Sequence, residues 1–509
     1  MRIKAALACA MMAGQALAQA PAEEPLSAIG WLKEKPQRSA LPGTVLLEPP
    51  VTGSAATPPV TVTPLENLPA PIGLVPPSAT GLPVGLWRGS APNEVAQLIE
   101  TVPVRRSPAM QALLFTLLLS ETRAPAEGGD RILLARINRL IALGATDPAQ
   151  ALLEHAGAAA SRERFARWFD TTLLTGSEER SCKALADAPH LAPGYPARIF
   201  CAMRGGDWST AALLLETAAT LEVLPQAQLE LLDRFLNPDF YEQAPPLAPP
   251  AAPDPLTFRL YESIGEPLPT APLPPAFAAA DLRDLAGWKA QLEAAERLTR
   301  NGALPPNQLL GLFSTRKPAA SGGVWDRVSA LQTFEAALER KDREALDRAL
   351  PRAWEAMQAA GLETAFAELF ADRLARAGLE GPSAALAWRI RLLSPSYELA
   401  AHGVPDDGAE SRFLAALARG RPGDATAPSA LAGAIAEGFQ PGTPVPYSLQ
   451  KLLDNGQLGE AILRSMVQFA HGADGNLDEL STALAAFRAV GLEDTARRAA
   501  LQLMLLERR

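Results

Sequence analysis

Cysteine and histidine are scarce in this chain, whose 509 residues include three cysteines and four histidines. A zinc site needs such ligands in a cluster, and a redox-active dithiol needs a close pair such as Cys-x-x-Cys. Neither arrangement occurs in the sequence, since the histidines are scattered singly at His155, His190, His402 and His471. We therefore expect no metal-binding, cofactor-binding or redox-active residues.

Long apolar runs are also missing. The most apolar stretch, ALLFTLLL at 112–119, is less than half of the roughly 20 residues that a membrane-spanning helix needs. We expect no transmembrane segment in the mature chain. Basic residues are outnumbered, 47 against 56 acidic ones, and they are scattered, which argues against a nucleic-acid partner.

The first eighteen residues have the pattern of an export signal. Arg2 and Lys4 precede an apolar run at 5–14, and Ala16-Leu17-Ala18 supplies the small-x-small motif that signal peptidase recognises. We predict a signal peptide that is cleaved after Ala18. The protein is then exported, to the periplasm if the host has two membranes.

Helix-forming residues are what the chain has in abundance. Ala and Leu are frequent, whereas aromatic residues make up 6% and other strand-favouring types are sparse. Apolar residues recur with the helical period, as at Leu133, Ile137 and Leu140. Turns such as GATDPA at 144–149 and GLETA at 361–365 begin with a glycine that can end a helix. We predict an all-α fold, an irregular α-solenoid of stacked antiparallel helical hairpins.

Two proline-rich stretches interrupt the helical pattern, with thirteen prolines at 36–92 and eleven at 245–275. Proline removes a backbone donor and favours extended geometry in the residue before it. The first stretch is predicted to be an extended strap along the folded body, or alternatively an arm that binds a partner. The predicted organisation is a signal peptide at 1–18, a short helix and Pro-rich extended segment at 19–91, a helical block with a disulfide hairpin at 92–243, a Pro-rich connector at 244–276 and a second helical block at 277–509.

Cys182 and Cys201 are the two cysteines that lie outside the expected signal peptide. Helical candidates flank the turn HLAPGYP at 190–196, and the two cysteines stand at similar distances from its centre. In an antiparallel hairpin they face each other, and an oxidising compartment favours a disulfide there. Such a bridge contributes about 3 kcal/mol through loop closure. The alternative is a pair of buried free thiols.

Two short motifs suggest chemistry without completing it. Asp474, Asn476 and Asp478 match the start of a calcium loop, but the later ligands are missing, and Asn476 can instead cap a helix with Glu479 in a capping box. Ser314-Thr-Arg-Lys317 fits the S-x-x-K of β-lactamase-type acyltransferases without their other motifs. We expect no catalytic residues from these motifs.

The glycine turns loosely resemble those of tetratricopeptide-type α-solenoids. The segments PLSAIGWL, VTPLENLPAPIGLVPPSATGLP and ARIFCAMRGGDW are similar to those of a family of exported alphaproteobacterial helical-repeat proteins of uncharacterised activity. This resemblance implies export and no site residues.

The architecture favours a periplasmic scaffold or adaptor that binds an envelope protein or peptide on its surface. One alternative is a cell-wall-active enzyme resembling lytic transglycosylases, with an unrecognised carboxylate site, and another is a purely structural envelope component. A deep pocket with a perturbed carboxylate would indicate the enzyme.

Overall fold

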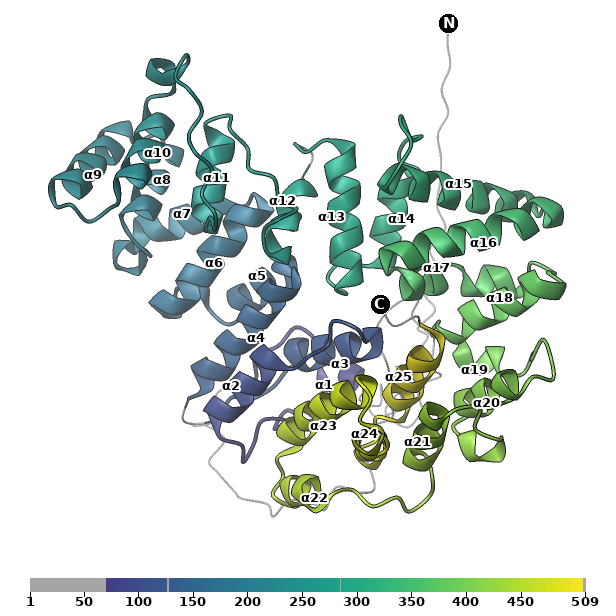
Figure 1. The fold of residues 1–509 in the computed structure, drawn as a ribbon. Helices are drawn as coiled ribbons and strands as arrows, with labels where there is room; N and C mark the ends of the chain where they lie inside the picture. Colours follow the sequence, from purple (N-terminus) through teal and green to yellow (C-terminus); the bar gives the residue numbers. More distant parts are fainter. Residues whose placement is uncertain (1–69, 126–127, 284, 507–509) are drawn as a thin grey trace, which may run out of the picture. The chain divides into compact units, whose positions relative to one another are not determined.

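The structure is a computed structural model that describes residues 70–125, 128–283 and 285–506 (Figure 1). Over these residues it consists of helices and turns without a β-strand, which confirms the predicted all-α fold. The predicted signal peptide, the short apolar helix around Trp31 and the Pro-rich residues 36–69 lie outside the described residues.

The first half of the described chain contains α1 (Pro77–Thr80), α2 (Pro92–Thr101), α3 (Pro108–Leu119), α4 (Gly129–Leu143), α5 (Thr146–His155), η2 (Ala158–Ala160), α6 (Arg162–Thr175), α7 (Glu178–Asp187), η3 (Pro189–Leu191), α8 (Tyr195–Arg204), α9 (Trp208–Thr220), α10 (Gln226–Leu236), η4 (Pro238–Tyr241), α11 (Pro255–Ser263), η5 (Pro275–Phe277) and α12 (Ala278–Asp281).

The second half contains α13 (Trp288–Arg300), α14 (Pro306–Ser314), α15 (Val324–Arg340), α16 (Arg343–Ala360), α17 (Glu363–Ala375), α18 (Gly381–Leu392), α19 (Tyr397–Ala400), α20 (Ala409–Ala418), η6 (Pro422–Asp424), α21 (Ala430–Gly438), α22 (Tyr447–Asp454), α23 (Leu458–Ala473), α24 (Leu477–Ala489) and α25 (Glu493–Leu505). No helix among the described residues is long and apolar enough to cross a membrane.

Consecutive helices pack as hairpins in several places, among them α8 with α9, α15 with α16 and α23 with α24. The predicted glycine turns separate such helices: Gly361 follows α16 with a φ of 67°, and its N–H bonds back to the carbonyl of Gln358. Glycine is favoured at this position because the left-handed conformation is sterically costly for residues that have a Cβ. The α-solenoid arrangement itself stays a prediction.

The described part of the first Pro-rich stretch lies on the helical body as a strap. Ile72 exchanges two backbone hydrogen bonds with Thr122, of 2.9 and 3.1 Å, just after α3. A Cβ on Gly73 would lie 2.3 Å from the Cα of Glu121, so only glycine permits this close approach. Further along, Trp87 is buried against Gly459 at the start of α23. For these residues the strap interpretation is confirmed.

A buried arginine on α4 fastens this strap. The Arg136 guanidinium donates to the carbonyl oxygens of Leu118 and Ser120, both at 2.8 Å, and to that of Ile72 at 3.2 Å. It also donates to the Thr122 hydroxyl at 3.1 Å. Burial lowers the pKa of Arg136 to about 10. These neutral oxygens compensate a cation that would otherwise be costly to bury.

Two large apolar cores hold the described helices together. One joins α2–α11 with α18–α25, and the other lies among α12–α18. The first core therefore combines helices from both ends of the described chain, and the Ala109 N–H of α3 donates to the Gln502 side-chain oxygen of α25 at 2.8 Å. The predicted boundaries at 92–243, 244–276 and 277–509 stay predictions.

Candidate functional site

The predicted cysteine pair lies in a helical hairpin formed by α7 and α8. The sulfur atoms of Cys182 and Cys201 are 1.99 Å apart, a disulfide distance, and the Cα atoms are 5.0 Å apart. The turn between the helices contains η3, as the proline and glycine of HLAPGYP led us to expect. A cross-link in this hairpin fixes α8, which packs on α9 and α10, to α7.

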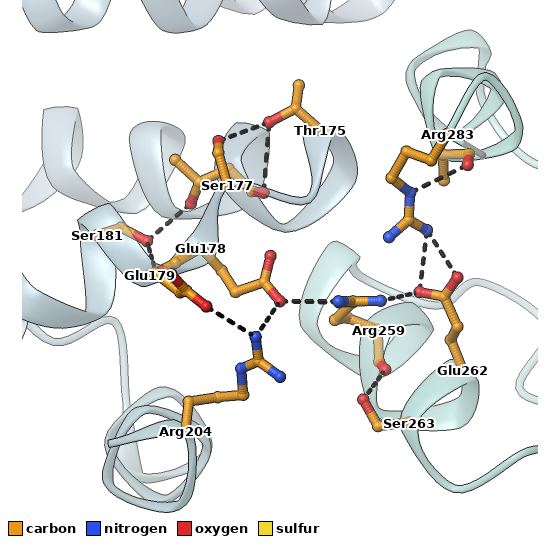
Figure 2. Close-up of polar contacts among 12 residues, drawn as sticks. Thr175, Ser177, Glu178, Glu179, Ser181, Arg204, Arg259, Glu262, Ser263 and Arg283 are labelled. Atoms are coloured by element: carbon orange, nitrogen blue, oxygen red, sulfur yellow. Dashed lines mark hydrogen bonds and ion pairs between the residues drawn. The ribbon is translucent and has the colours of Figure 1, made fainter. Parts of the chain in front are cut away.

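Charged side chains reinforce the same hairpin (Figure 2). Glu178, the first residue of α7, is 1% exposed and accepts from Arg259 of α11 at 2.8 Å. Arg204 at the end of α8 approaches the same carboxylate oxygen at 3.5 Å. Arg259 also bonds Glu262, which in turn pairs with Arg283 at 2.8 Å. We call these five residues the charge clamp.

The charge clamp is a structural feature with each carboxylate facing a guanidinium. Burial acts to lower the pKa of Arg259, but the hydrogen bond and charge of Glu178 outweigh it and raise the pKa above the usual value. The Arg259 guanidinium therefore stays charged and is not suited to exchange a proton. Sequence reasoning missed the clamp because its main partners, Glu178 and Arg259, are far apart in the sequence.

Beside this hairpin, α9 is an apolar helix with an uncovered face. It packs on α8 and α10 (Figure 1), and within it Ala211 and Ala218 are the buried residues. Leu213 on α9 is 63% exposed. A single exposed leucine is ordinary on a protein surface, whereas a group of large apolar side chains indicates an interaction site.

The exposed apolar side chains continue at both ends of α9. Trp208 begins the helix, is half exposed, and donates from its indole N–H to the carbonyl of Leu236 at 3.2 Å. Leu221 and Val223 lie in the turn before α10, and Phe240 in η4 is 82% exposed. We call residues 207–242 the α9 edge. It holds half of the large apolar side chains that are exposed in the described part of the chain.

Acidic side chains are frequent in the same segment of the chain. The α9 edge contains one basic residue, Arg234, which is engaged by Glu266 at 3.2 Å. The acidic residues of the edge are Asp207, Glu216, Glu222, Glu230, Asp233, Asp239 and Glu242. The surface thus combines an apolar centre with negative charge. That combination is complementary to an apolar segment flanked by lysine or arginine.

Local interactions give the α9 edge a defined shape. Asp207 caps α9 by accepting from the Thr210 N–H at 3.0 Å, and its bonds with Thr210 and Ser209 lower the pKa of Asp207. At the other end the Tyr241 hydroxyl donates to Asp233, which raises the pKa of Tyr241. The exposed apolar groups are therefore carried by ordered helices and turns.

Two cavities lie in the described part of the chain at places lined by no residue of the α9 edge, and we compare the carboxylates with both. One of about 410 Å³ lies beside the strap and Arg136, and the other of about 860 Å³ lies where α3, α13, α16, α23 and α25 meet. Burial raises the pKa of Asp170 to about 7, and it also raises the pKa of Asp281 and Glu335. None of these three carboxylates lines either cavity.

The short motifs of the sequence serve local structure. Asn476 caps α24 by accepting from the Glu479 N–H at 3.3 Å, which confirms the predicted cap. The Glu479 carboxylate accepts from the Asn476 side-chain amide at 2.7 Å, whereas the Asn476 backbone N–H bonds the carbonyl of His471, so the reciprocal bond of a capping box is not formed. Ser314 ends α14 and donates to the carbonyl of Leu310 at 2.8 Å. No group of three or more potential metal ligands occurs among the residues described.

No family model matches the chain, and no curated protein or solved structure matches it at a significant level. The functional interpretation therefore depends on the residues and their geometry.

Proposed function

We propose that the protein is exported to the periplasm and acts there as a helical-repeat scaffold or adaptor that binds a protein or peptide partner without catalysis. The observation that carries this proposal is the α9 edge, where Trp208, Leu213, Leu221, Val223 and Phe240 are exposed together. Exposed apolar side chains on ordered helices and turns are typical of a protein-binding surface.

The acidic rim defines the chemistry of the partner. A segment with apolar side chains on one face and lysine or arginine beside them would bury the exposed groups and meet the carboxylates of the rim. An amphipathic basic helix has both properties. Since the rim charges are solvent-exposed, they contribute mainly to the association rate and to its dependence on salt.

The alternative of a cell-wall-active enzyme needs a carboxylate of raised pKa in a cleft that can hold a glycan. Five carboxyl groups of the described residues have a raised pKa, and none of them lines either cavity: Asp147, Asp170, Asp281, Glu335 and Glu368. The geometry therefore favours the adaptor, and release of fragments from purified peptidoglycan by the protein would reverse this preference.

A photo-reactive residue in place of Leu213, in the full exported chain, tests the proposal in living cells. We expect one reproducible envelope protein to be cross-linked, and we expect Leu221→Glu in the same chain to abolish the product. A photo-reactive residue in place of Glu344, which is exposed on α16, is the matched control. Cross-links confined to the chain's own residues 19–35 would show that the surface is covered from within and contradict the adaptor.

The salt dependence of the purified complex then tests the partner chemistry. We expect the affinity to fall as the salt concentration rises, because the rim carboxylates attract basic groups. An affinity that does not change with salt would contradict the basic partner. Export is tested separately by mass spectrometry of the mature N-terminus, which we expect to be Gln19.

A further inference from the structure

The cavity of about 860 Å³ lies far from the α9 edge in sequence and has the opposite charge. It is lined by the turn before α3, the end of α13, the junction of α16 and α17, and the ends of α23 and α25. Its volume is in the range of small-ligand sites. Three arginines line it, Arg105, Arg106 and Arg300, against two carboxylates, those of Glu363 and Asp474. The lining thus has one positive charge in excess, within a protein that is acidic overall.

Part of this positive charge has a structural role. The Arg300 Nε donates to the carbonyl of Ala360, the last residue of α16, at 2.6 Å. Arginine is favourable at this end of a helix because the carbonyl groups there lack partners. Arg106 approaches Asp474 at 3.7 Å, and both side chains are more than two-thirds exposed, so this pair is weak.

Arg105 has no such role. Its side chain donates no hydrogen bond and forms no ion pair with the described residues, although its backbone carbonyl accepts from Gln111 at 3.4 Å. It lies two residues before Ser107, the N-cap of α3, where the helix end is positive and disfavours a cation. Burial and the charge of Arg105 together lower the pKa of nearby Arg139. Burial and the charge of Arg300 do the same for Arg297.

The remainder of the lining includes the polar residues Ser107, Gln358 and Gln502 and a larger group of apolar ones. Phe469, Leu503, Leu506 and the alanines at 470, 473 and 499 come from α23, α25 and the residue after α25. A ligand that fills this space must therefore present apolar groups to these side chains and one negative charge to the arginines. A carboxylate matches the single excess charge, and guanidinium groups bind carboxylates in a bidentate manner.

We propose that this cavity binds an apolar chain that ends in a carboxylate, with Arg105 as the principal anion-binding residue. The C-terminus of an apolar peptide and a free aliphatic acid both have this chemistry. The site is separate from the α9 edge, so it is a second binding function beside the adaptor role.

Fluorescence anisotropy with a labelled peptide that ends in Leu-Ala-Leu-Phe tests the proposal on the full mature chain. We expect the peptide with a free carboxylate to bind, and the same peptide with a C-terminal amide to bind at least about tenfold more weakly, because a charge-assisted pair is lost. Competition by decanoate would indicate a free acid as the natural ligand, whereas its failure to compete would indicate a peptide C-terminus. Equal binding of acid and amide, or no binding of the acid at about 1 mM, would overturn the proposal.

Variants of Arg105 locate the anion-binding residue. We expect Arg105→Gln to weaken binding of the acid about tenfold and to leave that of the amide unchanged, with Arg105→Lys in between. The matched control is Arg348→Gln, an exposed arginine of α16 that pairs with Glu344 and does not line the cavity. Leu213→Glu is a second control, since it alters the α9 edge alone. If the Arg105→Gln variant binds the peptide acid as tightly as the parent chain does, other residues bind the carboxylate. That result would contradict the proposed role of Arg105.

Discussion

Two helices of this protein have the same length and the same apolar content, yet one is exposed and the other is buried. Both α9 and α24 contain 13 residues, of which eight are apolar. In α9 two of these eight are buried, whereas in α24 six are buried, including Leu484 and Phe487. The difference is in their neighbours, since α24 packs on α21, α23 and α25, and α9 on α8 and α10.

The comparison shows that apolar content alone does not locate the core. Around α24 stability comes from burial of apolar side chains on several sides. Around α9 the supporting helix α8 is held by a disulfide and by the charge clamp, and large apolar side chains of α9 stay exposed. Each of the following predictions tests what stabilises the chain around α24 or around α9.

Removing one member of the charge clamp should have the largest effect. In the Arg259→Ala variant the buried carboxylate of Glu178 loses its 2.8 Å partner and remains largely desolvated. Breaking a buried pair from one side costs roughly 3–5 kcal/mol. Urea unfolding should show this loss, and Arg348→Ala, at an exposed pair, should change stability by less than about 0.5 kcal/mol. An equal loss of unfolding free energy in the two variants would contradict a stabilising role of the charge clamp.

Leucine truncation compares the two helices directly. Leu484→Ala in α24 should lower the free energy of unfolding by roughly 2–5 kcal/mol, because a fully buried side chain leaves a cavity. Leu213→Ala in α9 should change it by less than about 0.5 kcal/mol, since that side chain is 63% exposed. A large loss from Leu213→Ala would mean that another part of the chain covers α9 in solution. Thermal and urea unfolding of both variants give the answer.

The disulfide should contribute less than the core around α24. Replacing both cysteines, Cys182→Ser with Cys201→Ser, should lower stability by about 3 kcal/mol through the loss of loop closure. Partner binding at the α9 edge should weaken as well, because α8 supports α9. The control is the parent chain with a reducing agent, which should behave as the double variant does. Unchanged stability in both would show that the hairpin does not need the cross-link.

A pH dependence of stability should arise at Asp170 in α6. Burial raises its folded-state pKa to about 7, above the usual value of 3.8. As the pH rises from about 4 to 7, the unfolded chain loses this proton while the folded chain keeps it, so stability falls over that range. Asp170→Asn should reduce this fall and raise stability at neutral pH. The same pH dependence in both chains would place its source elsewhere.

Much of the local structure could be predicted from the sequence. The turn glycines Gly144 and Gly361, the helix cap at Asn476 and the pairing of Cys182 with Cys201 each depend on residues close in the chain. Local backbone preferences and hydrogen bonds determine such features, and they do not need the rest of the fold.

The candidate site could not be predicted in the same way. The indole N–H of Trp208 bonds the carbonyl of Leu236 at the end of α10, a residue 28 positions away in the chain. The charge clamp joins Glu178 to an arginine 81 residues away, and the cavity brings Arg105 close to Arg300. The sequence pattern of a single helix does not indicate contacts between residues that are so far apart in the chain.

The sequence by itself determined that this chain forms helices, where several of them end, and which two cysteines pair. Only the tertiary structure decided which apolar faces are covered. The physical reason is that helical periodicity depends on residues three or four apart, whereas burial depends on helices that arrive from distant parts of the chain. The same tertiary packing left α9 exposed beside its acidic rim and gathered three arginines around an apolar cavity.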